Sequence, residues 1–253
     1  MRPYKIYICE YAYRKCLMSE RVMGSTDHSP VEVPYYIWVV TNGEHTAVVD
    51  MGATESNIVK HGRFWLEEPA SLLDKVGVAP RAVEHAIVTH MHWDHAGNYE
   101  LFPRAKFHVQ EDELAFWTGR HVKRSYFNKA IEVEDVCAMV RYNYDGRVNL
   151  IPGSREILPG VTVHRVGGHT KGIQVVEVQT ASGPAVIASD ACADYHLLRT
   201  DTPSTIICDV PEYLDGFDTL RRLTRDERHI LPGHDIEALQ VNRRITERIS
   251  VLE

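Results

Sequence analysis

Three histidines and an aspartate stand within six positions of the sequence, at His90, His92, Asp94 and His95. Imidazole nitrogens and carboxylate oxygens suit a borderline divalent cation such as zinc. His90 and His92 project the same way from an extended segment, while Asp94 and His95 begin an expected helix that ends at Leu101. This spacing crowds a single ion and suits two adjacent ions. The alternative is a solvated, histidine-rich turn.

Short apolar strands are expected directly before these and other metal-type side chains. The run Ala86–Ile87–Val88 predicts a buried strand that leads into the histidines. Further apolar strands end near Val166, Ala188 and Leu231. The metal-type residues that follow the four strands are His90 with His92, then His169, Asp190 and His234. Ligands of open α/β sheets bind outside the carboxyl ends of the strands, so parallel neighbours would gather these side chains along one edge.

Taken singly, the later residues say little. A lone histidine after a strand, such as His169 or His234, is more often a surface or core residue. Asp190 alone would fit a helix cap. Only their combination with the first motif favours a metal site.

The complete pattern is H-x-H-x-D-H, then H, then D, then H, and it resembles the signature of the metallo-β-lactamase superfamily from roughly Tyr35 to Asp235. The resemblance implies an α/β fold of the αββα sandwich type, with two mixed sheets between helical layers. It also implies which residues hold two divalent ions, most simply Zn²⁺. The first site would hold His90, His92 and His169, the second Asp94, His95 and His234, and Asp190 would bridge the two ions.

Within this superfamily the chain looks like the N-acyl homoserine lactonase branch, which implies quorum quenching. The segment from Gly168 to Gly172, Gly-His-Thr-x-Gly, carries this likeness. The resemblance implies a dinuclear metal-dependent hydrolase that opens a lactone ring by attack of a metal-bridging hydroxide. Asp94 would then hand a proton to the leaving group, as in related lactonases.

Two positions depart from that branch. Ala193 stands where the branch commonly has a substrate-contacting tyrosine, with Tyr195 and His196 as nearby substitutes or mere surface residues. Ile173 stands where a histidine is usual. One alternative is therefore hydrolysis of another ester, thioester or phosphodiester at the same metal site. The other is a metal-stabilised binding module without catalysis.

Composition narrows the class of protein. The 253 residues carry a net charge of -7 and no basic block, so no nucleic-acid partner is expected. Five scattered cysteines indicate a reducing compartment. Residues 1–10 contain no long apolar segment, so neither a signal peptide nor a membrane partner is expected. We expect a cytoplasmic enzyme with a small-molecule substrate, a lactone or related ester, and leave a homodimer open.

No Pro/Ser-rich linker divides the chain, which predicts a single domain over residues 1–253. Residues 11–34 lack periodicity and are long for a connection, so we expect a loop that covers the substrate. Asn42–Gly43 predicts a hairpin between strands 35–40 and 46–49. Other expected elements are a strand at 206–208 and helices at 215–225 and 236–252.

Overall fold

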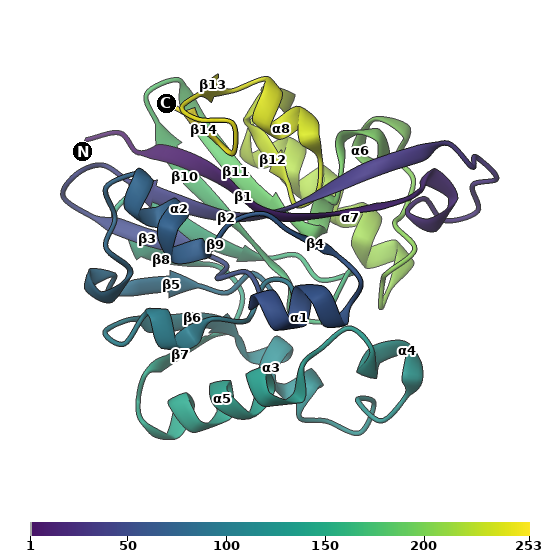
Figure 1. Cartoon of the computed structure of the whole chain (residues 1–253), viewed down its shortest axis with the longest axis horizontal. Coiled ribbons are helices and arrows are strands. Elements are labelled where there is room, and N and C mark those ends of the chain that lie inside the picture. The colour runs from purple at the N-terminus through teal and green to yellow at the C-terminus, as the bar shows by residue number, and fades with distance from the viewer. Residues whose placement is uncertain (1) are drawn as a thin grey trace.

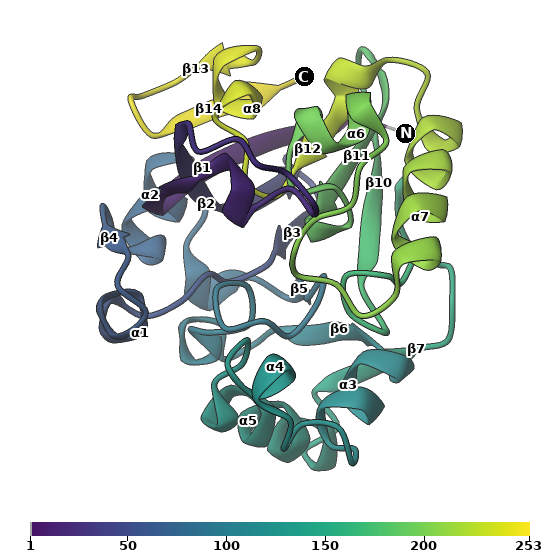
Figure 2. The same ribbon diagram turned by 90° about the vertical axis from the view of Figure 1, so that its right-hand side faces the viewer.

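Two β-sheets face each other at the centre of the fold, and helices cover both outer faces (Figure 1 and Figure 2). This is a computed structural model, and it describes residues 2–253. The αββα arrangement expected from the sequence is confirmed.

The larger sheet has nine strands, in the order β13-β14-β1-β2-β3-β5-β6-β7, with β4 paired to β1. Its strands are β1 (Lys5–Leu17), β2 (Pro30–Thr41), β3 (Thr46–Val49), β4 (Phe64–Trp65), β5 (His85–Ile87), β6 (Lys106–Gln110), β7 (Val148–Ile151), β13 (Arg243–Arg244) and β14 (Ile249–Leu252). The predicted hairpin joins β2 to β3, which pair antiparallel. From β3 through β5 and β6 to β7 the pairing is parallel.

The smaller sheet has five strands in the order β12-β11-β10-β9-β8. They are β8 (Arg155–Leu158), β9 (Val161–Arg165), β10 (Gln174–Thr180), β11 (Gly183–Ser189) and β12 (Ile230–Pro232). Because β10 is antiparallel to both β9 and β11, while β12 is parallel to β11, the strands β9, β11 and β12 run the same way. Their carboxyl ends therefore share one edge, as the sequence predicts. The expectation of parallel neighbours holds only for β11 and β12, because β10 separates β9 from β11 and the strand before His90 belongs to the larger sheet.

Helices α1 (Glu55–Lys60), α2 (Pro69–Lys75), α3 (Glu111–Trp117), α4 (Ser125–Asn128) and α5 (Val133–Tyr144) lie over the larger sheet. Helices α6 (Tyr195–Thr200) and α7 (Val210–Leu223) lie over the smaller one, and α8 (Ile236–Gln240) packs beside β14. Short 3₁₀ turns occupy Met18–Glu20, Pro80–Ala82, Tyr99–Leu101, Asp190–Cys192 and Glu227–His229. None of the helices described for residues 2–253 has the length and apolarity needed to cross a membrane.

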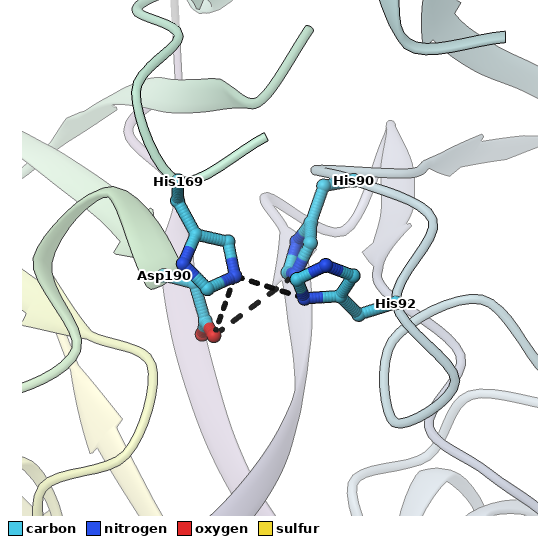
Figure 3. Close-up of side chains that lie close together, drawn as sticks. All are labelled: His90, His92, His169 and Asp190. Carbon is cyan, nitrogen blue, oxygen red and sulfur yellow. Dashed lines mark hydrogen bonds and ion pairs between the residues drawn. The ribbon is translucent and has the colours of Figure 1, made fainter. Parts of the chain in front are cut away.

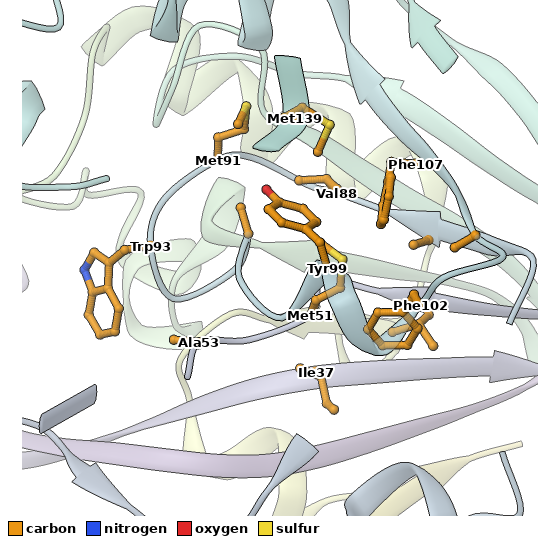
Figure 4. Close-up of a cluster of buried hydrophobic side chains, with 14 of the residues drawn as sticks. Ile37, Met51, Ala53, Val88, Met91, Trp93, Tyr99, Phe102, Phe107 and Met139 are labelled. Carbon is orange, nitrogen blue, oxygen red and sulfur yellow. The ribbon is translucent and has the colours of Figure 1, made fainter. Parts of the chain in front are cut away.

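The alternation of side chains along the strands builds the core. On β2, Trp38 and Val40 face the other sheet, while Ile37 and Val39 face the helices. The outer cluster continues beneath the histidine motif, where Val88, Met91, Trp93 and Tyr99 are buried with Ile37 and Met139 (Figure 4). The apolar residues interleaved with the histidines thus anchor the motif to the core.

The expected helix at 94–101 is wrong. Turns follow the motif instead, because Asn98 adopts a left-handed backbone with φ 54° and because Gly97 donates to the carbonyl of Gly52 at 2.8 Å. A Cβ on Gly97 would meet that carbonyl, so the chain is pinned against the neighbouring loop rather than coiled.

The expected strand at 206–208 is also wrong, since Cys208 N donates to the carbonyl of Gly168 in a loop contact. The expected helix at 236–252 ends at Gln240, and Ile249–Leu252 forms β14 on the free edge of β1. The helix expected at 215–225 begins earlier, at Val210, because the Asp209 side chain caps it by accepting from Glu212 N.

The expected loop at 11–34 is largely strand. Antiparallel pairing of β1 with β2 runs out to the pair Leu17 and Pro30, so only the segment between them is a connection. The polar composition misled the prediction because this hairpin extends beyond the inter-sheet core, where alternate side chains face solvent or a cavity.

Candidate metal centre

The structure brings all seven motif side chains together at the shared sheet edge. They form two adjacent groups, in each of which the potential ligand atoms lie within 4.8 Å of one another. The first group is His90, His92, His169 and Asp190, and their side chains point toward one another in Figure 3. The second group is Asp94, His95 and His234. Either group has the donors to hold one cation.

The Asp190 carboxylate lies between the two groups. Its Oδ2 is 3.2 Å from His169 Nε2 and 4.0 Å from His90 Nε2. Its Oδ1 is 3.1 Å from His234 Nε2 and 3.4 Å from His95 Nε2. One oxygen therefore faces each group, which is the geometry of a bridging ligand.

The donor set fits divalent cations. Within residues 2–253, the buried atoms His90 Nε2, His95 Nε2 and Asp190 Oδ1 have no hydrogen-bond partner. Buried polar atoms without a partner are costly, and cations held by the two groups would satisfy all three. Burial also lowers the pKa of His90, His92 and His169, so these imidazoles are neutral and offer lone pairs.

For Asp190 and His95, neighbouring charges shift the pKa against the effect of burial. Burial alone would raise the pKa of Asp190, but the nearby His234, His95 and His169 hold it well below its usual value. Burial likewise opposes a charge on His95, yet the carboxylates of Asp94, Asp190 and Asp50 raise its pKa well above the usual value. The carboxylates therefore concentrate negative charge at the centre, which favours the binding of cations.

Asp50, at the end of β3, orients the second group and was not identified from the sequence. It is fully buried and accepts from Thr89 N, Thr89 Oγ1 and His95 Nδ1, each at 2.7 Å. A proton on His95 Nδ1 leaves Nε2 free to face the metal centre. The available signal was a carboxylate at the carboxyl end of a strand that runs parallel to β5.

Glu113 joins the two ligand loops and was also missed. This buried carboxylate accepts from Met91 N at 2.8 Å, Gly172 N at 2.9 Å, Thr170 Oγ1 at 2.6 Å and Trp117 Nε1 at 2.7 Å. It therefore fixes the loop of His92 against the loop of His169. A glutamate in the first turn of a helix carries no sequence signal for such a role.

The strand ends approach the ligands closely. The backbone of Gly233 lies against the Asp190 carboxylate, where any Cβ would clash. His234 Nδ1 is 2.8 Å from the carbonyl oxygen of Pro34, which can only accept, so His234 Nε2 is the nitrogen free to face Asp190. Glycine at position 233 is what permits this approach.

A cavity of about 460 Å³ opens above the centre, and His92, Asp94, His169, Asp190 and His234 lie at its floor. Trp93 lines the cavity, stacked on His61 with ring centroids 4.0 Å apart. The apolar side chains Met18, Met23, Phe64 and Trp65 do not line it. They pack elsewhere or face solvent; Phe64, for example, stacks on Tyr13.

Ala193 does line the cavity, and neither proposed substitute for the absent tyrosine does. Tyr195 points away and donates to the carbonyl of Ile230 at 2.7 Å, while His196 is exposed. The tyrosines that do line the cavity are Tyr35 and Tyr126. Cys192 is buried, and burial raises the pKa of its thiol well above the usual value, so it is a packing residue.

Residues 31–234 match the model of the metallo-beta-lactamase superfamily, and the chain belongs to that superfamily. It is a metal-dependent hydrolase. An N-acyl homoserine lactonase from Bacillus sp is 26% identical over 241 residues, covering 88% of this chain and 90% of the relative.

Two solved structures share the fold. An N-acyl homoserine lactone hydrolase with the product N-hexanoyl-L-homoserine bound at its catalytic metal centre is 23% identical, with a TM-score of 0.78 over 97% of this chain and 98% of the other. A dizinc quorum-quenching lactonase is 13% identical, with a TM-score of 0.68 over 98% of this chain and 94% of the other.

Proposed function

We propose that this chain is a dinuclear metal-dependent lactonase that opens the ring of N-acyl homoserine lactones. The observation that carries the proposal is the Asp190 carboxylate, whose two oxygens face two separate ligand groups at the floor of an open cavity. The curated relatives named N-acyl homoserine lactonase support the substrate class. In keeping with them, quorum quenching is the role we propose.

The proposed ligands are the seven residues of the two groups. His90, His92 and His169 would hold one ion, Asp94, His95 and His234 would hold the other, and Asp190 would bridge them. Zinc suits these nitrogen and oxygen donors, and the similar fold of a dizinc lactonase supports that choice. When bound, two such ions supply Lewis-acid polarisation of the substrate carbonyl and lower the pKa of water at neutral pH.

Asp94 is the proposed catalytic residue of the chain itself. It lies at the cavity floor with Oδ2 3.6 Å from both His95 Nε2 and His234 Nε2. A carboxyl there can hold a proton and give it to the ring oxygen as the ester bond breaks. Tyr35 lies next to it, with its ring packed edge-on at 5.0 Å from the ring of His234.

The hairpin of residues 11–34 is proposed to cover the substrate. Arg14, Glu20, Arg21 and Val33 of this segment line the cavity. We further propose that residues 1–253 act as one domain, because the ligands come from both sheets. A cytoplasmic location is part of the proposal, and the five free cysteines support it.

The second candidate function is hydrolysis of another ester, thioester or phosphodiester. Ala193 favours it, because that position lacks the tyrosine expected of the lactonase branch and leaves the wall of the cavity apolar there. The same metal centre would serve such a substrate.

The test is a substrate screen with protein reconstituted with zinc. The panel contains acyl homoserine lactones of several chain lengths, aromatic lactones, a thioester and a bis-aryl phosphate. We expect turnover of the acyl homoserine lactones, about two zinc ions per chain by elemental analysis, and loss of both in Asp190→Ala. The exposed Asp74→Asn variant is the matched control. Full metal loading without turnover of any lactone would refute the proposal.

A further inference from the structure

Three basic side chains line the cavity without a carboxylate partner. Arg14, Arg63 and Lys129 all contribute to its wall, and within residues 2–253 no carboxylate oxygen lies within 4.0 Å of their charged nitrogens. The chain as a whole carries a net charge of -7, so unpaired positive charge in the cavity above the metal centre is opposite in sign to the overall charge. A ligand with negative charge would neutralise these side chains.

The fold of the hairpin directs Arg14 into the cavity. In the β1–β2 register Arg14 is opposite Val33, and Ala12 is opposite Tyr35. Alternation along a strand therefore places Arg14 on the same face as Tyr35, which also lines the cavity. The Nε of Arg14 is buried, and in the described chain it has no hydrogen-bond partner. A buried donor of this kind is costly until an acceptor arrives.

Arg63 reaches the same place from the turn before β4. Its Nε donates to the Tyr35 hydroxyl at 3.1 Å, which fixes the guanidinium and leaves its terminal nitrogens available. The ring of Tyr35 in turn packs against His234 at the metal centre. Arg63 therefore lies one tyrosine side chain away from the metal centre. Arg14 lies on the same face of the hairpin as that tyrosine.

The other charges on the cavity wall do not cancel this positive charge. Arg21 is buried in an ion pair with Asp194 at 2.6 Å. The exposed Glu20 carboxylate accepts from Leu17 N at 2.7 Å and keeps one negative charge, which the three basic side chains outnumber. The carboxylates at the floor, Asp94 and Asp190, belong to the metal centre. The charge left for a ligand beyond the metal centre is therefore positive.

We propose that Arg14 and Arg63 bind an oxyanion, a carboxylate or a phosphate, at the end of the substrate remote from the scissile ester. The planar guanidinium fork matches the oxygens of either group. This assigns the enzyme an acid-terminated acyl lactone rather than a neutral one, and it rests on the proposed function for the reaction itself. Lys129, exposed at the rim, would draw such an anion inward.

The experiment compares two substrates of equal length. N-hexanoyl homoserine lactone is neutral, whereas N-adipoyl homoserine lactone carries a terminal carboxylate; a phosphate-terminated analogue distinguishes the second oxyanion. The kcat/KM of the zinc enzyme should favour one of the acid forms by roughly tenfold to hundredfold, chiefly through KM. The preference should shrink as salt rises, because the charges are partly exposed.

Substitutions test whether the two arginines cause the preference for acid-terminated substrates. Arg14→Met and the double variant with Arg63→Met should remove it, because they should lower kcat/KM for the acid-terminated substrate far more than for the hexanoyl substrate. The Arg14 side chain makes no hydrogen bond within residues 2–253, so Arg14→Met should fold normally. Arg63→Lys keeps the charge without the fork and should restore only part of the preference. Arg81→Met, at an exposed arginine outside the cavity, is the matched control.

A binding measurement separates this inference from the proposed reaction. Calorimetric titration compares ring-opened N-adipoyl homoserine with N-hexanoyl homoserine. Tighter binding of the adipoyl compound that depends on Arg14, even without turnover of any lactone, would support the anion site while refuting lactonase activity. Turnover of both lactones with equal kcat/KM and equal product affinity would overturn the anion site and leave the lactonase intact. Equal losses for both substrates in the arginine variants would also overturn it.

Discussion

Replacing Asp50 by asparagine should weaken one of the two metal sites more than the other. The Thr89 backbone N–H must keep an acceptor at the Oδ1 position, so the new amide group occupies the place of Oδ2. It then faces His95 Nδ1, which is 2.7 Å from Oδ2 in the native chain. An amide donor there forces the His95 proton onto Nε2, the atom that faces the metal centre.

The expected loss of metal affinity follows from one hydrogen bond, the one between residue 50 and His95 Nδ1, whose acceptor is replaced by a donor. A hydrogen bond to a charged group contributes roughly 1.5–3 kcal/mol. Loss of such an outer partner typically lowers metal affinity by about tenfold to hundredfold. We therefore expect that loss at the site of Asp94, His95 and His234. The loss should be smaller at the site of His90, His92 and His169, which Asp50 reaches only through Thr89 Oγ1.

Competition with a chromophoric zinc chelator measures the two sites separately. The native protein should bind about two ions per chain tightly, and Asp50→Asn should show one tight and one weakened step. Asp74→Asn, which removes an exposed carboxylate on α2, is the control. Equal weakening of both steps, or none, would refute the argument that Asp50 acts through His95.

Asp94→Asn should lower the turnover number far more than the metal content; parallel losses would leave Asp94 a ligand alone. Chelation should lower the melting temperature, because buried ligand nitrogens then lack a partner, and zinc should restore it; an unchanged melting curve would contradict the metal centre. Burial, with Glu132 and Glu134, raises the pKa of Asp135 to about 7. The folded state therefore holds this proton more tightly, and stability falls as pH rises towards 7. Asp135→Asn should remove that fall in urea titrations; an unaltered pH dependence would count against it.

The placement of metal-type side chains directly after apolar strands could be predicted, because it depends on residues that are adjacent in the sequence. An apolar run followed at once by His90, His169, Asp190 or His234 is legible in the sequence. The strands at these places lie where expected within a few residues, and three of them, β9, β11 and β12, end at one edge of the smaller sheet. What brings the side chains of the two sheets to one point is the packing between sheets, which only the structure shows.

The incorrect secondary-structure predictions and the unidentified orienting residues have a common physical cause. In each case the residues interact with a partner distant in the sequence, which local periodicity does not reveal. The sequence predicts a helix over 236–252, but Ile249–Leu252 pairs with the edge of β1 instead. The polar segment 11–34 becomes strand because β1 and β2 pair with each other far beyond the core. Asp50 and Glu113 orient ligands through buried hydrogen bonds to residues distant in the chain.

Each ligand group takes donors from both halves of the polypeptide. His90 and His92 follow a strand of the larger sheet, whereas His169 and Asp190 follow strands of the smaller one, and the second group is divided in the same way. A cation in either group would therefore cross-link the loops of the larger sheet to those of the smaller sheet. Sliding of one half past the other would have to break coordination bonds, so loaded protein should resist proteolytic nicking and mechanical shear that the empty protein does not.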